Sequence, residues 1–394
     1  MGSVLIKAFI LSLFEWLIFP GRLVVAIPQA GWKNVPRRLL IFGSAWLVMG
    51  ILNAIHWLGF ALDEIFFRNY RHIQIIQPLF ILGVPRSGTT FLQRVLAQDS
   101  NLTSLTLWEC LLAPSISERY CWRSIGRLFS PFIKPLIRWG SKNTDAFNAI
   151  HPLGLKEPEE DFLLLLPVQA CFLMVLLCPK DRHFWQLSNF DDGIGTKRRQ
   201  CIMAFYKRCL QKHLYYHGVR KQILSKNPSF TPFIASLRAT FSDAQFVACI
   251  RAPQSAIPSQ LSALLPAVKF LGFKKLPDEF SQSILDMLQR YYEIIKQQQS
   301  ANDLQTVDLS ELSANLYACV NRLYAVFNRN LSKDFYHKLQ AMELNGRKYR
   351  SRHQHTLSDN SLIDHQVRQR FAPYWPMVTL LNQTAEVSFN ETHI

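Results

Sequence analysis

The sequence lacks the patterns that mark metal-binding, disulfide-rich and nucleic-acid-binding proteins. Its eight cysteines include no CxxC pair and no metal-ligand spacing, and several lie inside apolar runs. This arrangement excludes a zinc finger and predicts buried free thiols in a reducing compartment. The chain also has no internal repeat, no basic repeat and no aromatic platform for bases, so nucleic acid is not an expected partner.

Acidic residues are few. The 394 residues include 28 Asp and Glu against 44 Lys and Arg, which gives a formal net charge of +16. A balance this basic favours an anionic ligand or an anionic membrane surface, although a solvated basic face explains part of the excess. Because 49% of the residues are hydrophobic, the chain can bury a large core.

The first 72 residues differ from the rest of the chain. Residues 4–19 are strongly apolar, and residues 39–62 contain no Asp, Glu, Lys or Arg, which makes the second run long enough to span a bilayer. We expect a membrane-associated helical segment, as one span, a helical hairpin or an in-plane pair; buried helices of a soluble enzyme are the plainer alternative. No small-residue cleavage site follows the first run, so a cleavable signal peptide is not expected.

The basic connector between these two runs favours the cytoplasmic side of the membrane. We therefore expect the rest of the chain to lie on that side. Four Asn-x-Ser/Thr tripeptides keep a lumenal location open, because they fit the glycosylation pattern.

A short apolar stretch at residues 79–82 is followed by a glycine-containing turn and then by apolar residues at helical spacing. In a strand–turn–helix unit, the backbone N–H groups of the turn and of the helix N-terminus converge on an anion. Arg86 adds a guanidinium group, which can bind an anion through two parallel hydrogen bonds. The remaining predicted ligands of this loop are Ser87, Gly88, Thr89 and Thr90. An ordinary turn between a strand and a helix is the plainer alternative.

This turn departs from the Walker A motif of nucleotide hydrolases. Gly83 and Gly88 have the spacing of that motif, but Thr89 stands where the motif has its lysine. No acidic strand end convincing as a magnesium site is present either. A nucleotide kinase or NTPase therefore remains only an alternative function.

From residue 77 onward, strand-like and helix-like segments alternate, which predicts an α/β fold with a parallel sheet. Residues 162–178, which are almost wholly apolar, are expected to form a buried core helix. The other predicted strands are 222–226 and 245–250, and the other predicted helices are 196–220, 230–241, 279–300 and 311–331.

Two more segments follow predicted strands in the same way as the loop. Ser-Lys-Asn-Pro occupies residues 225–228, and Ile-Arg-Ala-Pro occupies residues 250–253, with Ser259 eight residues beyond Arg251. With the Pro85–Thr90 loop, these segments resemble, in the same order, the motifs of sulfotransferases that use 3′-phosphoadenosine 5′-phosphosulfate. The resemblance is to the broad bacterial-type family, with motif similarity to tyrosylprotein sulfotransferases.

The resemblance implies a P-loop-NTPase-like parallel sheet flanked by helices. The predicted domain covers residues 73–376, between the apolar segment at 1–72 and a polar tail at 377–394. 3′-Phosphoadenosine 5′-phosphosulfate is the implied co-substrate, and no metal is expected. Arg251 and Ser259 would hold its 3′-phosphate, although a routine structural arginine and a surface serine would look the same.

The implied reaction is transfer of a sulfuryl group to the hydroxyl or amine of a small-molecule or lipid acceptor, which the apolar segments suggest is lipophilic. Lys226 would neutralise charge on the leaving phosphate oxygen. The candidates for the catalytic base are Glu109, His151 and Glu159, in that order. The structural alternatives are pairing with an arginine for Glu109 and, for Glu159, helix capping in an acidic first turn with Glu160 and Asp161. A non-catalytic membrane-bound scaffold that retains the fold is a further alternative.

Overall fold

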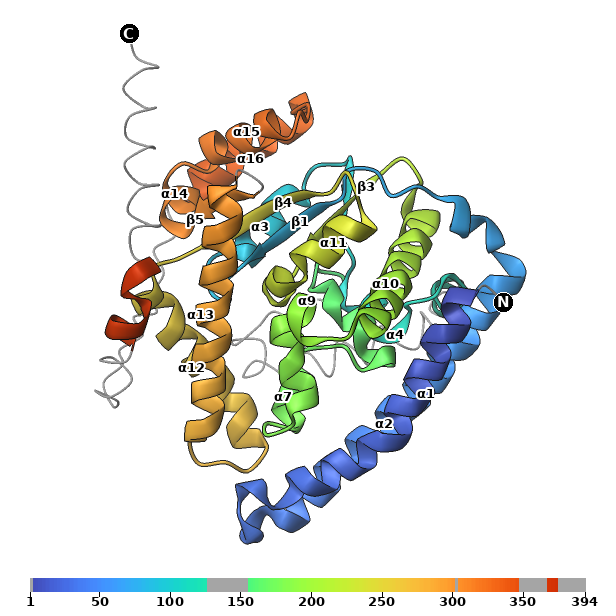
Figure 1. Ribbon diagram of the computed structural model, residues 1–394. Helices are drawn as coiled ribbons and strands as arrows, with labels where there is room; N and C mark the ends of the chain where they lie inside the picture. The colour runs from blue at the N-terminus through green and yellow to red at the C-terminus, as the bar shows by residue number, and fades with distance from the viewer. Residues whose placement is uncertain (1–2, 126–154, 302–303, 347–366, 375–394) are drawn as a thin grey trace, which may run out of the picture.

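The computed structural model describes residues 3–125, 155–301, 304–346 and 367–374. Its centre is a five-stranded parallel sheet with strand order β2-β3-β1-β4-β5 (Figure 1). The strands are β1 (Leu79–Gly83), β2 (Leu102–Thr103), β3 (Gln222–Lys226), β4 (Gln245–Ile250) and β5 (Gln305–Asp308). The predicted α/β fold with a parallel sheet is confirmed.

The sheet separates two hydrophobic cores because successive side chains of a strand point to opposite faces. On β1, Phe80 and Leu82 belong to one core, whereas Leu79 and Ile81 belong to the other. The first core is closed by α10 (Thr196–His217), α11 (Ile234–Thr240) and α13 (Asp278–Ser300). The second core is closed by α3 (Thr89–Leu96), α15 (Leu316–Val326) and α16 (Lys333–Gly346).

Further helices connect these elements. The α-helices are α4 (Leu107–Leu112), α7 (Met174–Leu177), α8 (Arg182–Trp185), α9 (Phe190–Gly193), α12 (Pro253–Phe270) and α14 (Leu309–Ala314). The 3-10 helices are η1 (Ile27–Ala30), η2 (Trp32–Asn34), η3 (Arg68–His72), η4 (Asp161–Val168), η5 (Gln186–Asn189), η6 (Pro228–Phe233) and η7 (Ala372–Tyr374).

The prediction of one core helix over residues 162–178 was wrong in form. The stretch is buried, but it folds as the 3-10 helix η4 and the short helix α7. Pro167 lies inside η4, and Gln169 after it adopts a left-handed conformation with φ 49°. A proline removes a backbone donor and a left-handed residue ends a helix, so the two together turn the chain.

The predicted helix over 311–331 is likewise divided, at Asn315, into α14 and α15. The strands β2 and β5 were not predicted. Both are short, and β5 has Val307 as its one apolar residue, so it lacks the apolar run that reveals β1 and β4.

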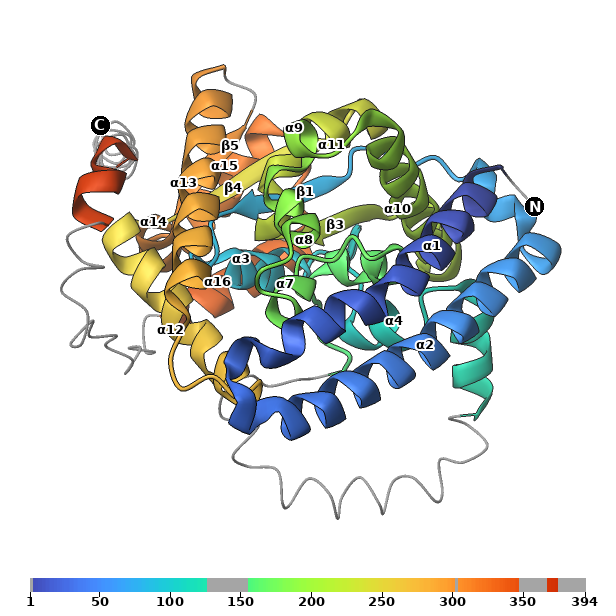
Figure 2. The ribbon, with the colours of Figure 1, turned by 60° about the horizontal axis from the view of Figure 1, so that its bottom comes forward.

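The N-terminal segment forms a helical hairpin of α1 (Ser3–Ala26) and α2 (Val35–Phe66). Both helices lie side by side along one edge of the body (Figures 1 and 2). Trp16 stacks on Trp46 with ring centroids 5.8 Å apart, and Phe9 meets Trp57 edge-on at 5.2 Å. The two helices are therefore antiparallel and in direct contact.

The cysteines agree with the prediction of free thiols. None is in a disulfide; six are buried, Cys201 is half-buried and Cys121 is exposed. Burial raises the pKa of Cys178 and of Cys209 to about 12, so these thiols are unreactive at neutral pH.

Candidate active site

The turn between β1 and α3 has a backbone that depends on its glycines. Gly83 has φ 124°, and a Cβ there would collide with the backbone of Cys249 on β4. Gly88 has φ 91°, and a Cβ there would lie 2.6 Å from Leu309 Cδ1. Arg86 also has a positive φ, of 67°. Such left-handed residues turn successive N–H groups toward one side, which is the geometry of an anion-binding loop.

Hydroxyl groups hold this loop in place from two sides. The buried Ser87 directs its hydroxyl at the carbonyl oxygens of Val84 (2.6 Å) and Cys249 (2.8 Å). Thr231 of η6 accepts from Gly83 N at 3.0 Å and lies 2.9 Å from Gly83 O. Because the Ser87 hydroxyl is engaged with the backbone, we expect this residue to offer an anion its N–H group. Thr89 is buried at the start of α3, and Thr90 is exposed.

Two arginines meet beside the loop. Arg86 Nε donates to Ser259 Oγ at 3.1 Å, and Arg251 Nη1 donates to Arg86 O at 3.2 Å. The structure thus brings together three predicted donor-binding residues from the loop, the end of β4 and α12. Within the described parts of the chain, neither arginine forms an ion pair with a carboxylate.

The positive charge at this point is only partly offset, by Asp308 at the end of β5, which is near Arg251 without forming an ion pair with it. Burial and the neighbouring positive charge of Arg86 lower the pKa of Arg251. Tyr292 fixes the backbone here by donating to Arg251 O at 2.6 Å. Two adjacent guanidinium groups held in place without a carboxylate partner form a site suited to a dianion such as a phosphate.

Lys226 lies at the carboxyl end of β3, in register with Ile81 of β1. Its side chain is 2% exposed, and Nζ donates to Glu160 Oε1 at 2.8 Å, with Glu159 Oε1 at 3.9 Å. The carboxyl ends of β1, β3 and β4 therefore bring the loop, Lys226 and Arg251 to one edge of the sheet. Ligands bind at this edge in open parallel sheets.

Several backbone contacts position the segment that carries Glu159. Gln93 of α3 donates to Glu159 O at 3.2 Å, and Glu159 N donates to Leu105 O at 3.0 Å. The side chain of Glu159 remains 35% exposed, whereas that of Glu160 is 28% exposed. Both carboxylates thus face solvent beside Lys226.

Asp161, which directly follows these glutamates, is the centre of a buried polar network. Its carboxylate accepts from Tyr206 Oη at 2.6 Å, from Ser225 Oγ at 2.9 Å and from Asn227 Nδ2. Burial raises the pKa of Asp161 to about 6, although these hydrogen bonds oppose the rise. Ser225 and Asn227 flank Lys226 on β3, so Asp161 fixes the lysine relative to the two glutamates.

Replacing Asp161 with alanine is expected to destabilise the protein by about 3 kcal/mol at neutral pH, because three buried donors lose their acceptor. The pKa of about 6 lies above the ordinary 3.8, so the folded protein binds this proton more tightly than the unfolded chain does. Wild-type protein therefore gains stability through Asp161 as the pH falls through 6 toward 4.

The alanine variant cannot gain this stability, so the difference in free energy of unfolding should be larger at pH 5 than at pH 7. Urea unfolding at the two pH values measures it. Asp192→Ala, at an exposed carboxylate, is the control, with an expected change within about 0.5 kcal/mol. A difference that stays constant between the two pH values would contradict the raised pKa.

Glu109 occupies a different environment from Glu159. It is 1% exposed and accepts from Thr106 N (2.9 Å) and Thr106 Oγ1 (2.8 Å) in a capping box at the start of α4. His217 Nε2 lies 2.5 Å and Arg119 Nη1 3.6 Å from its other oxygen. Although burial acts in the opposite direction, His217 and Arg119 hold the pKa of Glu109 well below its usual range.

Among the described residues, one cluster has the side chains that could hold a metal ion. It consists of Glu109, His213 and His217, and one potential ligand atom from each lies within 4.8 Å of the others. Arg119 points into this cluster: its Nη1 is 3.5 Å from His213 Nδ1 as well as close to Glu109. His213 Nε2 is engaged with Thr103 Oγ1 at 2.9 Å. A buried guanidinium thus supplies the positive charge that a metal ion would otherwise bring, so we assign the cluster a structural role.

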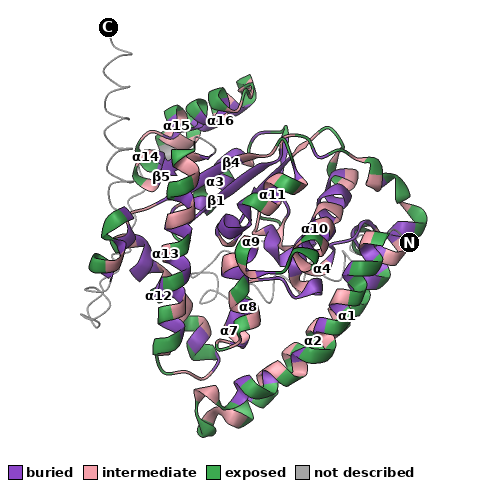
Figure 3. Ribbon diagram, viewed as in Figure 1, coloured by how far each residue is buried: buried purple, intermediate pink, exposed green. Residues whose placement is uncertain are grey.

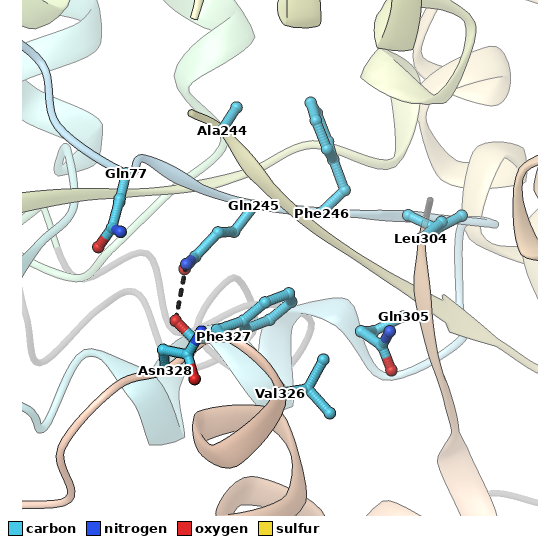
Figure 4. Close-up of a pocket in the computed structure, with 9 residues that line it drawn as sticks. All are labelled: Gln77, Ala244, Gln245, Phe246, Leu304, Gln305, Val326, Phe327 and Asn328. Atoms are coloured by element: carbon cyan, nitrogen blue, oxygen red, sulfur yellow. Dashed lines mark hydrogen bonds between the residues drawn. The ribbon is translucent and has the colours of Figure 1, made fainter. Parts of the chain in front are cut away.

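His151 lies outside the described residues. A hollow at the opposite edge of the sheet is lined by residues at the amino ends of β1, β4 and β5, including Gln77, Gln245 and Gln305 (Figure 4). Gln245 Nε2 donates there to Phe327 O at 2.9 Å. Since this hollow lies at the amino ends of the strands, it is separate from the candidate site.

Sequence reasoning missed several residues that shape the site. Asp161 was interpreted with Glu159 and Glu160 as an acidic first turn, and Thr231 and Tyr292 were not singled out. The signal for Asp161 is weak because its partners lie 45 to 66 residues away in the chain. The serine and asparagine on either side of Lys226 were the available hint, since polar residues at a buried strand end need a partner.

Comparison with known proteins agrees with this geometry. A family model described as "Sulfotransferase family" matches residues 78–333. The omega-hydroxy-beta-dihydromenaquinone-9 sulfotransferases Stf3 of Mycobacterium bovis and Mycobacterium tuberculosis are each 24% identical to this chain over 260 residues. The match covers 63% of this chain and 63% of the length of either relative.

Two crystal structures share the fold. Sulfotransferase STF1 of Mycobacterium tuberculosis superposes with a TM-score of 0.63 at 20% identity, over 91% of this chain and 92% of that one. Sulfotransferase STF9 of Mycobacterium avium gives a TM-score of 0.67 at 20% identity, over 86% and 85%. Since the family model covers more than half of the chain and begins at the strand that carries the anion loop, the chain belongs to the sulfotransferase family.

Proposed function

We propose that this protein is an enzyme that transfers a sulfuryl group from 3′-phosphoadenosine 5′-phosphosulfate to the hydroxyl of a lipophilic acceptor. The observation that carries the proposal is the convergence of Arg86, Arg251 and Lys226 at the carboxyl ends of β1, β4 and β3. Three cations around one glycine-bounded loop fit a donor that carries a phosphosulfate at one end and a 3′-phosphate at the other.

In this proposal Arg251 and Lys226 have separate tasks. Arg251 and Ser259 bind the 3′-phosphate, and the loop at residues 85–90 binds the 5′-phosphosulfate through its N–H groups. Lys226 leaves Glu160 and donates to the bridging oxygen as the sulfur–oxygen bond breaks and negative charge grows on the phosphate. Catalysis is then positioning and charge stabilisation, by analogy with phosphoryl transfer.

A lipophilic acceptor is supported by the way the site joins the N-terminal hairpin. The helix η4 begins directly after Glu160, and near its other end Pro167 O accepts from Ser12 Oγ of α1 at 2.5 Å. Seven residues of 3-10 helix span roughly 14 Å, so apolar α1 lies close to the catalytic edge. The Mycobacterium relatives are named for a menaquinone-derived acceptor, which supports the same chemical class here.

Membrane association on the cytoplasmic side remains part of the proposal. It is supported by two apolar helices, each long enough to cross a membrane by length and composition, and by the basic residues between them. The co-substrate is a soluble nucleotide, which suits a site open to the cytosol.

Glu159 is the proposed catalytic base. Glu159→Gln should lower kcat by about 100-fold or more and abolish the acidic limb of its pH profile, because a general base must be ionised. Glu109→Gln should instead lower the midpoint temperature of thermal unfolding, since the Glu109 carboxylate caps α4. This variant should keep the acidic limb of the kcat–pH profile. Loss of the acidic limb in Glu109→Gln alone, with wild-type stability, would reassign the base to Glu109.

The experiment that tests the proposed function is calorimetric titration of the purified protein with adenosine 3′,5′-bisphosphate, the expected product, beside ATP. Micromolar binding of the bisphosphate and transfer of labelled sulfate to a quinol or sterol would support it. Preference for ATP with magnesium-dependent hydrolysis would favour the kinase alternative, and no binding of either nucleotide would favour the scaffold.

A further inference from the structure

The N-terminal hairpin has an unusual distribution of side chains. On α1 the buried positions follow a spacing of three and four residues: Leu5, Ala8, Ser12, Glu15, Phe19, Leu23 and Ala26. This stripe faces the body. The opposite side of a surface helix is ordinarily polar, but many of the side chains exposed on both helices (Figure 3) are large and apolar. On α1 these are Ile6, Phe9, Ile10, Leu13, Phe14, Leu17, Ile18, Val24 and Val25.

The inward side of the hairpin is held to the body by buried charges. On α1, Glu15 pairs with His183 at 3.1 Å and with Arg198 at 3.2 Å. On α2, Asp63 pairs with Lys212 of α10 at 2.7 Å, and both side chains are fully buried. Separating either helix from the body would leave charges without partners, which is strongly unfavourable.

On α1 the buried residues run along the whole helix, whereas on α2 they lie near its two ends. Near the turn of the hairpin, Arg38 donates to Leu271 O at 2.8 Å, and farther along α2 His56 lies 2.6 Å from Glu118. A helix that crosses a bilayer has lipid or other membrane helices around it. Here α1 has the folded body along one side, and α2 is docked to that body at both of its ends.

The charges on the outward side all have one sign. Residues 3–66 contain three acidic side chains, Glu15, Asp63 and Glu64, and all are buried. The exposed charged residues are Lys7 near the start of α1 and Lys33 and Arg37 at the turn. An apolar face flanked by exposed cations is the pattern of a helix that lies in the interface of an anionic bilayer.

We propose that α1 and α2 lie in the plane of an anionic phospholipid surface, with their outward apolar side among the lipid chains and their inward side docked to the catalytic body. The proposal deepens the membrane association proposed above by choosing among one span, a spanning hairpin and an in-plane pair. Its test reports binding and topology only, so it fails or stands separately from the sulfuryl-transfer activity.

The first arm of the test is flotation of the full chain with sealed vesicles of phosphatidylcholine, with and without phosphatidylglycerol. We expect binding that is stronger when phosphatidylglycerol is present. The double variant Leu17→Glu, Leu47→Glu, at two exposed positions of the hairpin, should lose about tenfold or more of this binding. The matched control, Val326→Glu with Leu344→Glu, changes two exposed apolar residues elsewhere and should bind normally.

The second arm distinguishes the in-plane arrangement from a spanning hairpin. In a background with Cys121→Ser and Cys201→Ser, a Lys33→Cys variant bound to the outside of sealed vesicles is treated with an impermeant maleimide. We expect labelling as complete as at Lys338→Cys on the exposed surface of α16. Protection of position 33 until the vesicles are lysed would overturn the proposal, since a spanning hairpin places its turn on the far side.

A second copy of this chain is the competing occupant of the apolar surface. Sedimentation of the detergent-free protein as a dimer, with no flotation on either vesicle, would overturn the lipid assignment in favour of that copy. Unchanged flotation of the Leu17→Glu, Leu47→Glu variant would overturn it too.

Discussion

Lys226→Ala is expected to lower kcat about 100- to 1,000-fold, while the affinity for adenosine 3′,5′-bisphosphate changes only slightly. The lysine is aimed at the bridging oxygen, where charge develops only as the bond breaks, so its loss costs transition-state stabilisation and little ground-state binding. Glu160, which loses its partner, is 28% exposed and can be solvated. The variant should therefore remain folded.

Steady-state kinetics and calorimetry on the same preparation separate these effects. Lys338→Ala is a matched control, because Lys338 also forms a lysine–carboxylate pair, with Asp334 at 2.6 Å, on exposed α16. It should behave as wild type. A Lys226→Ala enzyme with normal kcat would remove the lysine from the mechanism.

Arg251→Ala is expected to weaken binding of the bisphosphate about 10- to 100-fold. A hydrogen bond to a charged group contributes about 1.5–3 kcal/mol, and Arg251 has no carboxylate partner among the described residues that would compete for it. The backbone at this point is held by Tyr292 through Arg251 O, so the side chain can be removed without moving the strand end.

The weakening should be specific to the 3′-phosphate. Adenosine 5′-phosphate, which lacks that group, should bind wild type and Arg251→Ala with similar affinity. Arg94→Ala, at an exposed arginine near the end of α3, controls for loss of general positive charge. Equal bisphosphate binding by wild type and Arg251→Ala would show that the 3′-phosphate binds elsewhere.

The parts of the fold that could be predicted from sequence are those whose signal is local. Strand β4 has the predicted bounds, and α10 buries Tyr206, Leu210 and Leu214 on one face as expected. The three strand-end motifs could be placed at one edge because parallel strands all end there. The strand β5 could not be found, since its Gln-Thr-Val-Asp sequence becomes a strand through pairing with β4.

The surroundings of the candidate base were harder to predict. Glu109 was ranked first as catalytic base because of its distance along the chain from the Pro85–Thr90 loop. Its neighbours His217 and Arg119 come from other segments and cannot be inferred from spacing. Glu159 and Glu160 were weighed as helix caps, whereas in the folded chain they face Lys226. Pairwise contacts between distant segments, and not local propensity, decide which carboxylates are available for chemistry.

The fully buried pair of Asp63 and Lys212 has a consequence for how this protein can be shortened or recombined. Lys212 belongs to α10, which packs against the catalytic sheet, whereas its counter-charge belongs to the N-terminal hairpin. A chain cut before β1 would lose not only Asp63 but also Phe60 and Tyr70, whose rings cover Lys212 Nζ at 5.5 and 3.9 Å, and would leave that face of α10 open to water. The hairpin therefore folds as part of the body, and a foreign N-terminal segment would have to supply both a carboxylate and an apolar cover for Lys212.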